Sequence, residues 1–154
     1  MPRISPFALL MRPEQHTLAI GFSCASQEEF PSLIAASFQR LAAYMDELGE
    51  LMTDNPYVAY SRETDGGFGV EVGFTVVRPL PGRGEIVAGS NPQGKEVMCM
   101  FLGPYQEMAP VYEEMKKWIA GKGLQEKGPV YEYYYNGPDM FPEMYLTRVM
   151  IPVF

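Results

Sequence analysis

The second half of this chain repeats the first, and the repetition limits the fold more than any other feature. Phe38, Leu41, Tyr44 and Gly49 match Tyr112, Met115, Trp118 and Gly123, with 74 residues between the members of every pair. Two further segments, 55–60 and 69–76, match 128–133 and 146–153 at offsets of 73 and 77 residues. Near-constant offsets through three elements indicate a tandem duplication.

Each half is predicted to contain a strand, a helix and two more strands. The expected elements are a strand at about 16–23, a helix at 31–48 and strands at 55–60 and 69–76, then a strand at 96–102, a helix at 104–120 and strands at 128–135 and 146–153. Gly66-Gly67 is typical of a hairpin turn, and Asn136 begins a longer equivalent connection. We therefore expect an α+β fold with one antiparallel sheet, two main helices on one face and a central ligand groove. The chain would be a single domain, 1–154, with pseudo-repeat halves at about 14–80 and 94–154.

Aromatic residues gather between Phe101 and Tyr135. Tyr105, Tyr112 and Trp118 are spaced by 7 and 6 residues, which predicts that they lie near one stripe of a helix. The strand that follows carries Glu132 among four tyrosines. One carboxylate among flat, amphipathic rings suits an apolar cation, because ring faces and Glu both attract positive charge. The alternative is a tyrosine-rich core with a solvated Glu.

Composition excludes several classes of protein. A chain of 154 residues with 47% hydrophobic and 20% charged residues is a folded globular protein. A net charge of −7 argues against a nucleic-acid surface and mildly favours cationic partners. The opening apolar run is too short for a signal peptide or a membrane span. Cys24 and Cys99 fit a reducing cytoplasm, where we expect the protein, although one bridge between them stays possible.

Residues for standard catalysis are scarce. A metal site or a Ser-His-Asp triad would have to use His16, the single histidine, at the start of the first predicted strand. The glycines at 66, 67 and 69 lack the spacing of a phosphate-binding loop. We therefore expect no metal and no cofactor. Eleven methionines fit either an adaptable binding surface or ordinary packing of the core.

An ordered set of motifs resembles the GyrI-like domain, which is the effector-binding domain of AraC-type and BmrR-type regulators. The set is Gly103-Pro104-Tyr105, Tyr112, Trp118-Ile119, Gly123-Leu124, Gly128-Pro129, Tyr131-Glu132-x-Tyr134 and Thr147…Ile151-Pro152-Val153. The resemblance implies polyspecific binding of bulky aromatic, preferably cationic, drugs or dyes. A subset of the family resembles hydrolases that open the cyclopropane ring of DNA-alkylating natural products.

The resemblance also implies roles for particular residues. Glu132 would be a buried carboxylate with Tyr134 on the same strand face, and this pair would be catalytic if the protein is a hydrolase. The other implied ligand contacts are Tyr112 and Trp118 on the second helix, Tyr44 and Phe38 on the first, Tyr105 and Phe74. The repeat places Ala59 opposite Glu132, so one acid rather than two would mark the site. Arg148 stands where the family often has Glu, and it could instead pair with Glu71.

Three functions follow from the resemblance. The first is xenobiotic binding, and the second is detoxification of cyclopropane-bearing alkylators in the same aromatic cage. The third is inhibition of, or partnership with, a macromolecule such as gyrase. About fifteen residues precede the first predicted strand, too few for a DNA-reading helix-turn-helix, so we expect no direct DNA binding. The sequence leaves the oligomeric state open.

Overall fold

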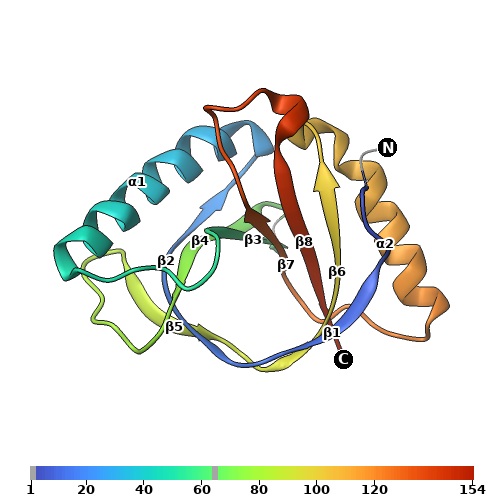
Figure 1. Cartoon of the computed structure of the whole chain (residues 1–154), viewed down its shortest axis with the longest axis horizontal. Helices are drawn as coiled ribbons and strands as arrows, with labels where there is room; N and C mark the ends of the chain where they lie inside the picture. Colours follow the sequence, from blue (N-terminus) through green and yellow to red (C-terminus); the bar gives the residue numbers. More distant parts are fainter. Residues whose placement is uncertain (1–2, 64–65) are drawn as a thin grey trace. The chain divides into compact units, whose positions relative to one another are not determined.

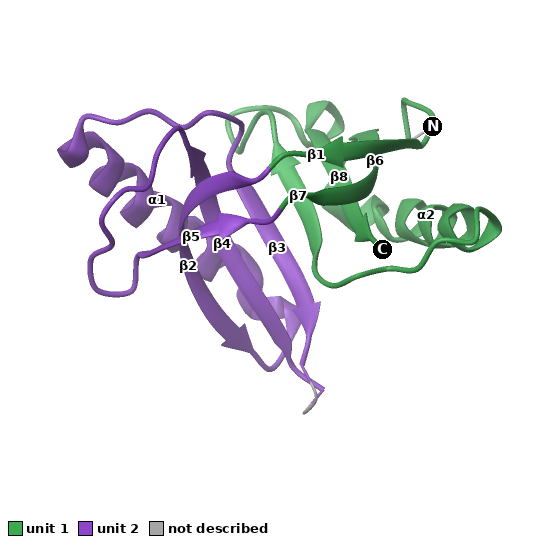
Figure 2. Ribbon diagram, turned by 90° about the horizontal axis from the view of Figure 1, so that it is seen from below, with its two compact units in different colours: residues 1–13, 93–154 green, residues 14–92 purple. Residues whose placement is uncertain are grey.

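The computed structural model describes residues 3–63 and 66–154, which form two compact units. Unit 1 comprises residues 1–13 and 93–154, and unit 2 comprises residues 14–92 (Figure 2). Among its described residues, each unit has four antiparallel strands and one main helix, which confirms the predicted α+β class. In the described part of the chain, no helix is both long and apolar enough to cross a membrane. That the two units act as a single domain stays a prediction.

Unit 2 follows the predicted order of elements. Its elements are β2 (Gln15–Cys24), η1 (Gln27–Glu29), α1 (Phe30–Leu48), β3 (Tyr57–Arg62), β4 (Phe68–Val76) and β5 (Val87–Asn91). The strands are ordered β3-β4-β2-β5 (Figure 1). The turn predicted at Gly66-Gly67 closes β3 on β4, because the Glu63 amide donates to the Gly67 carbonyl at 2.9 Å. Residues 64–65 of that turn lie outside the described residues.

Local chemistry sets both ends of α1. Pro31 occupies the first turn, where a missing N–H costs no helical hydrogen bond. Gly49 ends the helix in the left-handed conformation, with φ of 68°, and its amide donates to the Asp46 carbonyl. The buried face of α1 carries Leu41 and Met45, which are 0% and 4% exposed.

Unit 1 repeats this pattern with a different edge strand. Its elements are β1 (Ala8–Arg12), β6 (Gly94–Leu102), η2 (Tyr105–Glu107), α2 (Ala109–Gly121), β7 (Val130–Tyr134), η3 (Pro142–Met144) and β8 (Leu146–Val153). The strands are ordered β1-β6-β8-β7. Alternate residues of β6 and β8 share a core with α2: Val97, Cys99, Phe101, Val149, Ile151 and Val153 pack with Met108, Val111, Met115 and Ile119. Cys24 and Cys99 are both buried and free, and burial raises the pKa of the Cys99 thiol to about 11.

The prediction that the second helix begins at Pro104 was wrong. The α-helix starts at Ala109, and Tyr105 lies in the separate turn η2. Pro110 accounts for the difference, because proline inside a continuous helix removes one hydrogen bond and clashes with the preceding turn. At the beginning of α2 the same residue is tolerated. Tyr105 therefore does not belong to the helical stripe of Tyr112 and Trp118.

The sequence did not predict β1 or β5. β1 pairs with β6, from Ala8 opposite Met98 to Arg12 opposite Gly94. β5 pairs with β2, from Gln15 opposite Asn91 to Ala19 opposite Val87. Each unit thus gains an edge strand beyond the predicted strand–helix–strand–strand repeat.

Candidate functional site

Glu132 is the centre of a buried polar cluster in unit 1. Alternation along β7 places Val130, Glu132 and Tyr134 on the sheet face that carries α2. The Glu132 side chain is 8% exposed, and each of its oxygens accepts one hydrogen bond. Tyr112, from α2, donates its hydroxyl to Oε2 at 2.5 Å, and Tyr134 donates to Oε1 at 2.8 Å. Helix and strand together therefore hold the carboxylate in one orientation.

Burial controls the ionisation of Glu132. Desolvation raises the pKa of this carboxyl above its usual range, because an anion is disfavoured in an apolar interior. The two tyrosine hydrogen bonds act in the opposite direction, since they favour the charged form. Within the described residues, Glu132 has no Lys, Arg or His partner within 4.0 Å. The site is thus a buried acid that two hydroxyl groups orient and that no cationic side chain of the described residues neutralises.

Two further tyrosine rings adjoin this cluster. The Tyr105 ring stacks on Tyr145, with 4.9 Å between centroids and 22° between planes. It also meets the Tyr134 ring edge-on at 5.6 Å. Burial, Tyr145 and the Glu132 charge together raise the pKa of the Tyr105 hydroxyl to about 12. Since Tyr105 is 41% exposed, its ring joins the Glu132 cluster to the protein surface.

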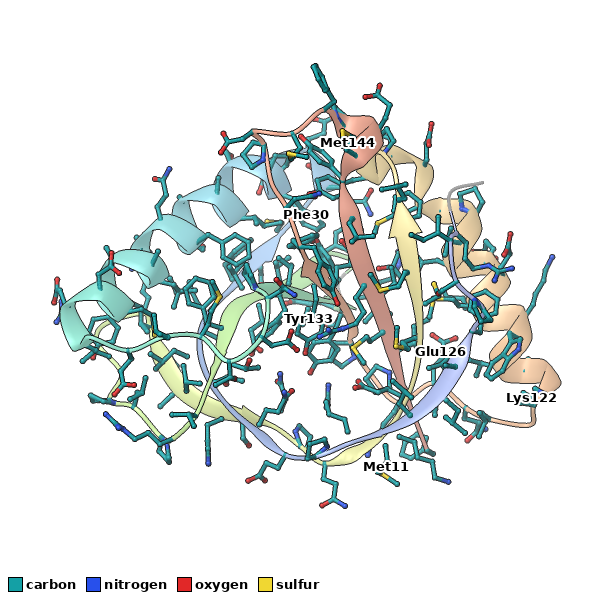
Figure 3. All side chains as sticks on the ribbon, viewed as in Figure 1. Met11, Phe30, Lys122, Glu126, Tyr133 and Met144 are labelled. Atoms are coloured by element: carbon teal, nitrogen blue, oxygen red, sulfur yellow. The ribbon has the colours of Figure 1, made fainter. Side chains whose placement is uncertain are left out.

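A long connection places Tyr145, which the sequence analysis did not identify. The Asn136 side chain makes two hydrogen bonds that hold this connection. Its Nδ2 donates to the Met144 carbonyl at 2.8 Å, and its Oδ1 accepts from the Leu146 backbone amide at 3.0 Å. Met144 lies at the outer end of that segment (Figure 3). The only sequence signal for Tyr145 was its position just before the last predicted strand.

Trp118 has different neighbours. Its ring packs against Phe7 at 5.9 Å, and the Lys122 ammonium lies 5.4 Å from the ring centroid. The expectation that Tyr105, Tyr112 and Trp118 lie near one stripe of a helix was wrong for Tyr105, which lies in η2. Tyr112 and Trp118 are both on α2 and pack against the core of unit 1. A ligand contact by Trp118 stays a prediction.

The remaining predicted contacts lie in unit 2. Phe38 stacks on Phe74, with 6.0 Å between centroids and 14° between planes. Tyr44 is 5% exposed, and its hydroxyl donates to the Pro81 carbonyl at 2.7 Å. The Arg83 guanidinium lies 4.4 Å from the centre of the Tyr44 ring. Contact of these residues with a ligand also stays a prediction.

Arg148 and Arg12 each lie over a tyrosine ring on the other face of the unit 1 sheet, and the Arg12 guanidinium is 5.2 Å from the centre of the Tyr131 ring. The Arg148 guanidinium lies 4.1 Å from the centre of the Tyr133 ring and donates to the Tyr135 hydroxyl at 3.1 Å (Figure 3 labels Tyr133). Arg12 forms a buried ion pair with Glu96 at 3.0 Å. The sequence analysis missed this pair, whose only signal was an arginine at the end of an apolar run.

Comparison with known proteins agrees with this architecture. The C-terminal domain of EcmrR superposes with a TM-score of 0.82 at 19% identity, and 97% of each chain is covered. The present chain spans 57% of the EcmrR chain in its complex with DNA. A hydrolase from Listeria innocua gives a TM-score of 0.70 at 16% identity, with 96% of this chain and 91% of that chain covered. SAV2435 bound to tetraphenylphosphonium gives a TM-score of 0.66 at 16% identity, with 97% of this chain and 94% of that chain covered.

At these identities the solved structures define the fold class alone, and the sequence defines the family. Residues 6–153 match the GyrI-like small molecule binding domain. The chain belongs to that family, as its motifs suggested, and is a small-molecule binding domain. No curated protein matches it in sequence.

Proposed function

We propose that the protein binds bulky aromatic cations of varied structure, with Glu132 as the group that recognises their charge. The observation that carries this proposal is a carboxylate 8% exposed, hydrogen-bonded by two tyrosines and lacking a cationic partner among the described residues. A buried anion is costly unless a cation compensates it. A bound cation would supply that compensation, and so binding would be coupled to ionisation of Glu132.

Tyrosine rings would supply most of the remaining contacts. Tyr105, Tyr112, Tyr134 and Tyr145 present flat faces and edges whose attraction to a cation does not depend on the detailed shape of the ligand. Such a lining favours charge and aromatic area over one particular structure, which is the basis of polyspecificity. SAV2435, a protein of the same fold, has been solved with tetraphenylphosphonium bound. That ion is therefore a suitable first probe.

The test compares one cation with one neutral molecule of similar shape. Tetraphenylphosphonium and neutral triphenylphosphine oxide are titrated calorimetrically into the natural protein and into Glu132→Gln. We expect the substitution to weaken binding of the cation by about 1–3 kcal/mol, which is the effect of a charge-assisted contact, and to leave binding of the neutral ligand nearly unchanged.

Glu113→Gln is the matched control. Glu113 follows Tyr112 on α2, is exposed, and its substitution changes the net charge by the same amount. We expect this variant to bind both ligands as the natural protein does. Equal losses for the two ligands in Glu132→Gln would show that Glu132 only supports the structure, and equal losses for the cation in both variants would point to a general effect of net charge.

A second candidate function is hydrolysis of strained electrophiles such as cyclopropane-bearing alkylators. The observation that favours it is the raised pKa of Glu132 beside the Tyr134 hydroxyl, at 2.8 Å, which is suited to general acid–base catalysis. The assay is mass-spectrometric detection of a water adduct. Glu132→Gln should lower turnover by about 10²–10⁴-fold. Recovery of intact alkylator after long incubation would leave binding as the sole activity.

A further inference from the structure

A second polar group lies beside the Glu132 cluster. The Thr147 side chain is 0% exposed, and its hydroxyl has no hydrogen-bond partner among the residues that the structure describes. Most buried hydroxyls in proteins are hydrogen-bonded, so an unpaired one calls for an explanation. Valine has nearly the same shape and would fill this position without a polar atom to satisfy.

The strand register places Thr147 next to the carboxylate. Thr147 is opposite Tyr134 on β7 and opposite Phe101 on β6. Glu132 is opposite Val149, two residues further along β8, and directly opposite residues of paired strands point to the same face. Glu132 and Thr147 are therefore diagonal neighbours on the α2 face, and such neighbours lie roughly 7–8 Å apart.

We propose that Thr147 is a second recognition residue of the site, which accepts a hydrogen bond from an N–H group of the ligand while Glu132 accepts another. This inference rests on the proposed function. It narrows the preferred ligand to aromatic cations whose charged group carries at least two N–H donors, such as arylamidines. A hydroxyl oxygen has two acceptor lone pairs, and a carboxylate has capacity beyond its two tyrosine bonds.

The Tyr105 ring provides the access route. It is partly exposed and packs on Tyr134 and Tyr145. It belongs to the short turn η2, and Gly103 precedes this turn with φ of 140°, a conformation that other residues rarely adopt. Rotation of the Tyr105 ring would break its contacts with Tyr134 and Tyr145. An arylamidine ring would replace it against Tyr145 and bring its N–H groups toward Glu132 and Thr147.

The experiment compares two cations across two variants. Diamidinophenylindole, whose amidinium groups carry N–H donors, is titrated by fluorescence, and tetraphenylphosphonium, which has none, by calorimetry. Thr147→Val removes the hydroxyl at nearly constant shape, and Thr147→Ser keeps it. We expect Thr147→Val to weaken binding of the amidine about tenfold, which is the effect of one hydrogen bond to a charged group. The affinity of Thr147→Ser for the amidine should stay within about twofold of that of the natural protein. Tetraphenylphosphonium should bind all three proteins equally.

Other outcomes would overturn the inference. Equal weakening of both cations in Thr147→Val would make Thr147 a packing residue, and unchanged amidine binding would exclude the contact. A lower melting temperature of ligand-free Thr147→Val would show that the hydroxyl serves the fold, since removal of an unpaired buried hydroxyl should raise that temperature. Failure of the proposed function looks different, because the natural protein would then bind neither cation or Glu132→Gln would not discriminate between charged and neutral ligands.

Discussion

The buried ion pair between Arg12 and Glu96 allows a quantitative test of how β1 is held. The two side chains are 9% and 2% exposed, so solvent screens them little, and the N–O distance is 3.0 Å. Glu96→Gln or Arg12→Met removes one member of this buried ion pair, which typically costs about 3–5 kcal/mol. A protein of this size loses about 2–4 °C of melting temperature for each kcal/mol. Each single variant should therefore melt about 6–20 °C below the natural protein.

The double variant separates charge burial from lost packing. The double variant lacks both charges, so it should lose less unfolding free energy than the two single variants together, by roughly 1–3 kcal/mol. Urea unfolding followed by the fluorescence of Trp118, the single tryptophan, measures all three variants. Trp118 packs on Phe7, which lies shortly before β1, and therefore reports on this part of unit 1.

Arg3 and Glu114 provide a matched comparison in the same unit. Their N–O distance is also 3.0 Å, but their side chains are 30% and 53% exposed. Glu114→Gln should cost no more than about 1 kcal/mol. Equal losses of unfolding free energy in Glu96→Gln and Glu114→Gln would refute this account of the buried pair. So would a double variant whose loss equals the sum of the Arg12→Met and Glu96→Gln losses.

Three further predictions concern ionisation and packing. The affinity for tetraphenylphosphonium should rise with pH as Glu132 loses its proton, and a pH-independent affinity would contradict this. The free energy of unfolding, relative to that of Glu132→Gln, should fall over the same pH range, because a raised folded-state pKa favours folding only while the acid is protonated. Tyr112→Phe removes a hydrogen bond that lowers the pKa of Glu132, so the rise in affinity should move to higher pH in titrations of this variant. Gly73→Ala would place its Cβ 2.5 Å from the hydroxyl oxygen of the fully buried Tyr57, so it should lower the free energy of unfolding in urea by about 1–3 kcal/mol. Gly21→Ala is the control and should lower it much less, because the nearest atom to its added Cβ is 3.8 Å away.

Sequence reasoning succeeded where local chemistry decides the structure. Pro31 and Gly49 mark the first turn and the end of α1, because proline and glycine have fixed meanings at those positions. Alternation along β7 is enough to place Tyr134 beside Glu132, since residues two apart share a strand face.

Features that depend on distant contacts were missed. β1 and β5 are short edge strands whose existence depends on pairing with β6 and β2 rather than on their own sequence pattern. Tyr145 reaches the cluster because Asn136 braces a loop, and no periodicity records such bracing. The late start of α2 was foreseeable from Pro110, but the aromatic spacing suggested a longer helix.

The strand register has a consequence for how this chain can be divided. Arg12 and Gly94 face each other at one end of the β1–β6 pair, and Gln15 and Asn91 face each other in the β2–β5 pair. Unit 2 is therefore topologically an insertion whose two ends return side by side, a common property of inserted domains. A direct peptide bond from Pro13 to Gln93 would leave a loop of two residues between β1 and β6. The resulting continuous polypeptide would retain every residue of the Glu132 cluster.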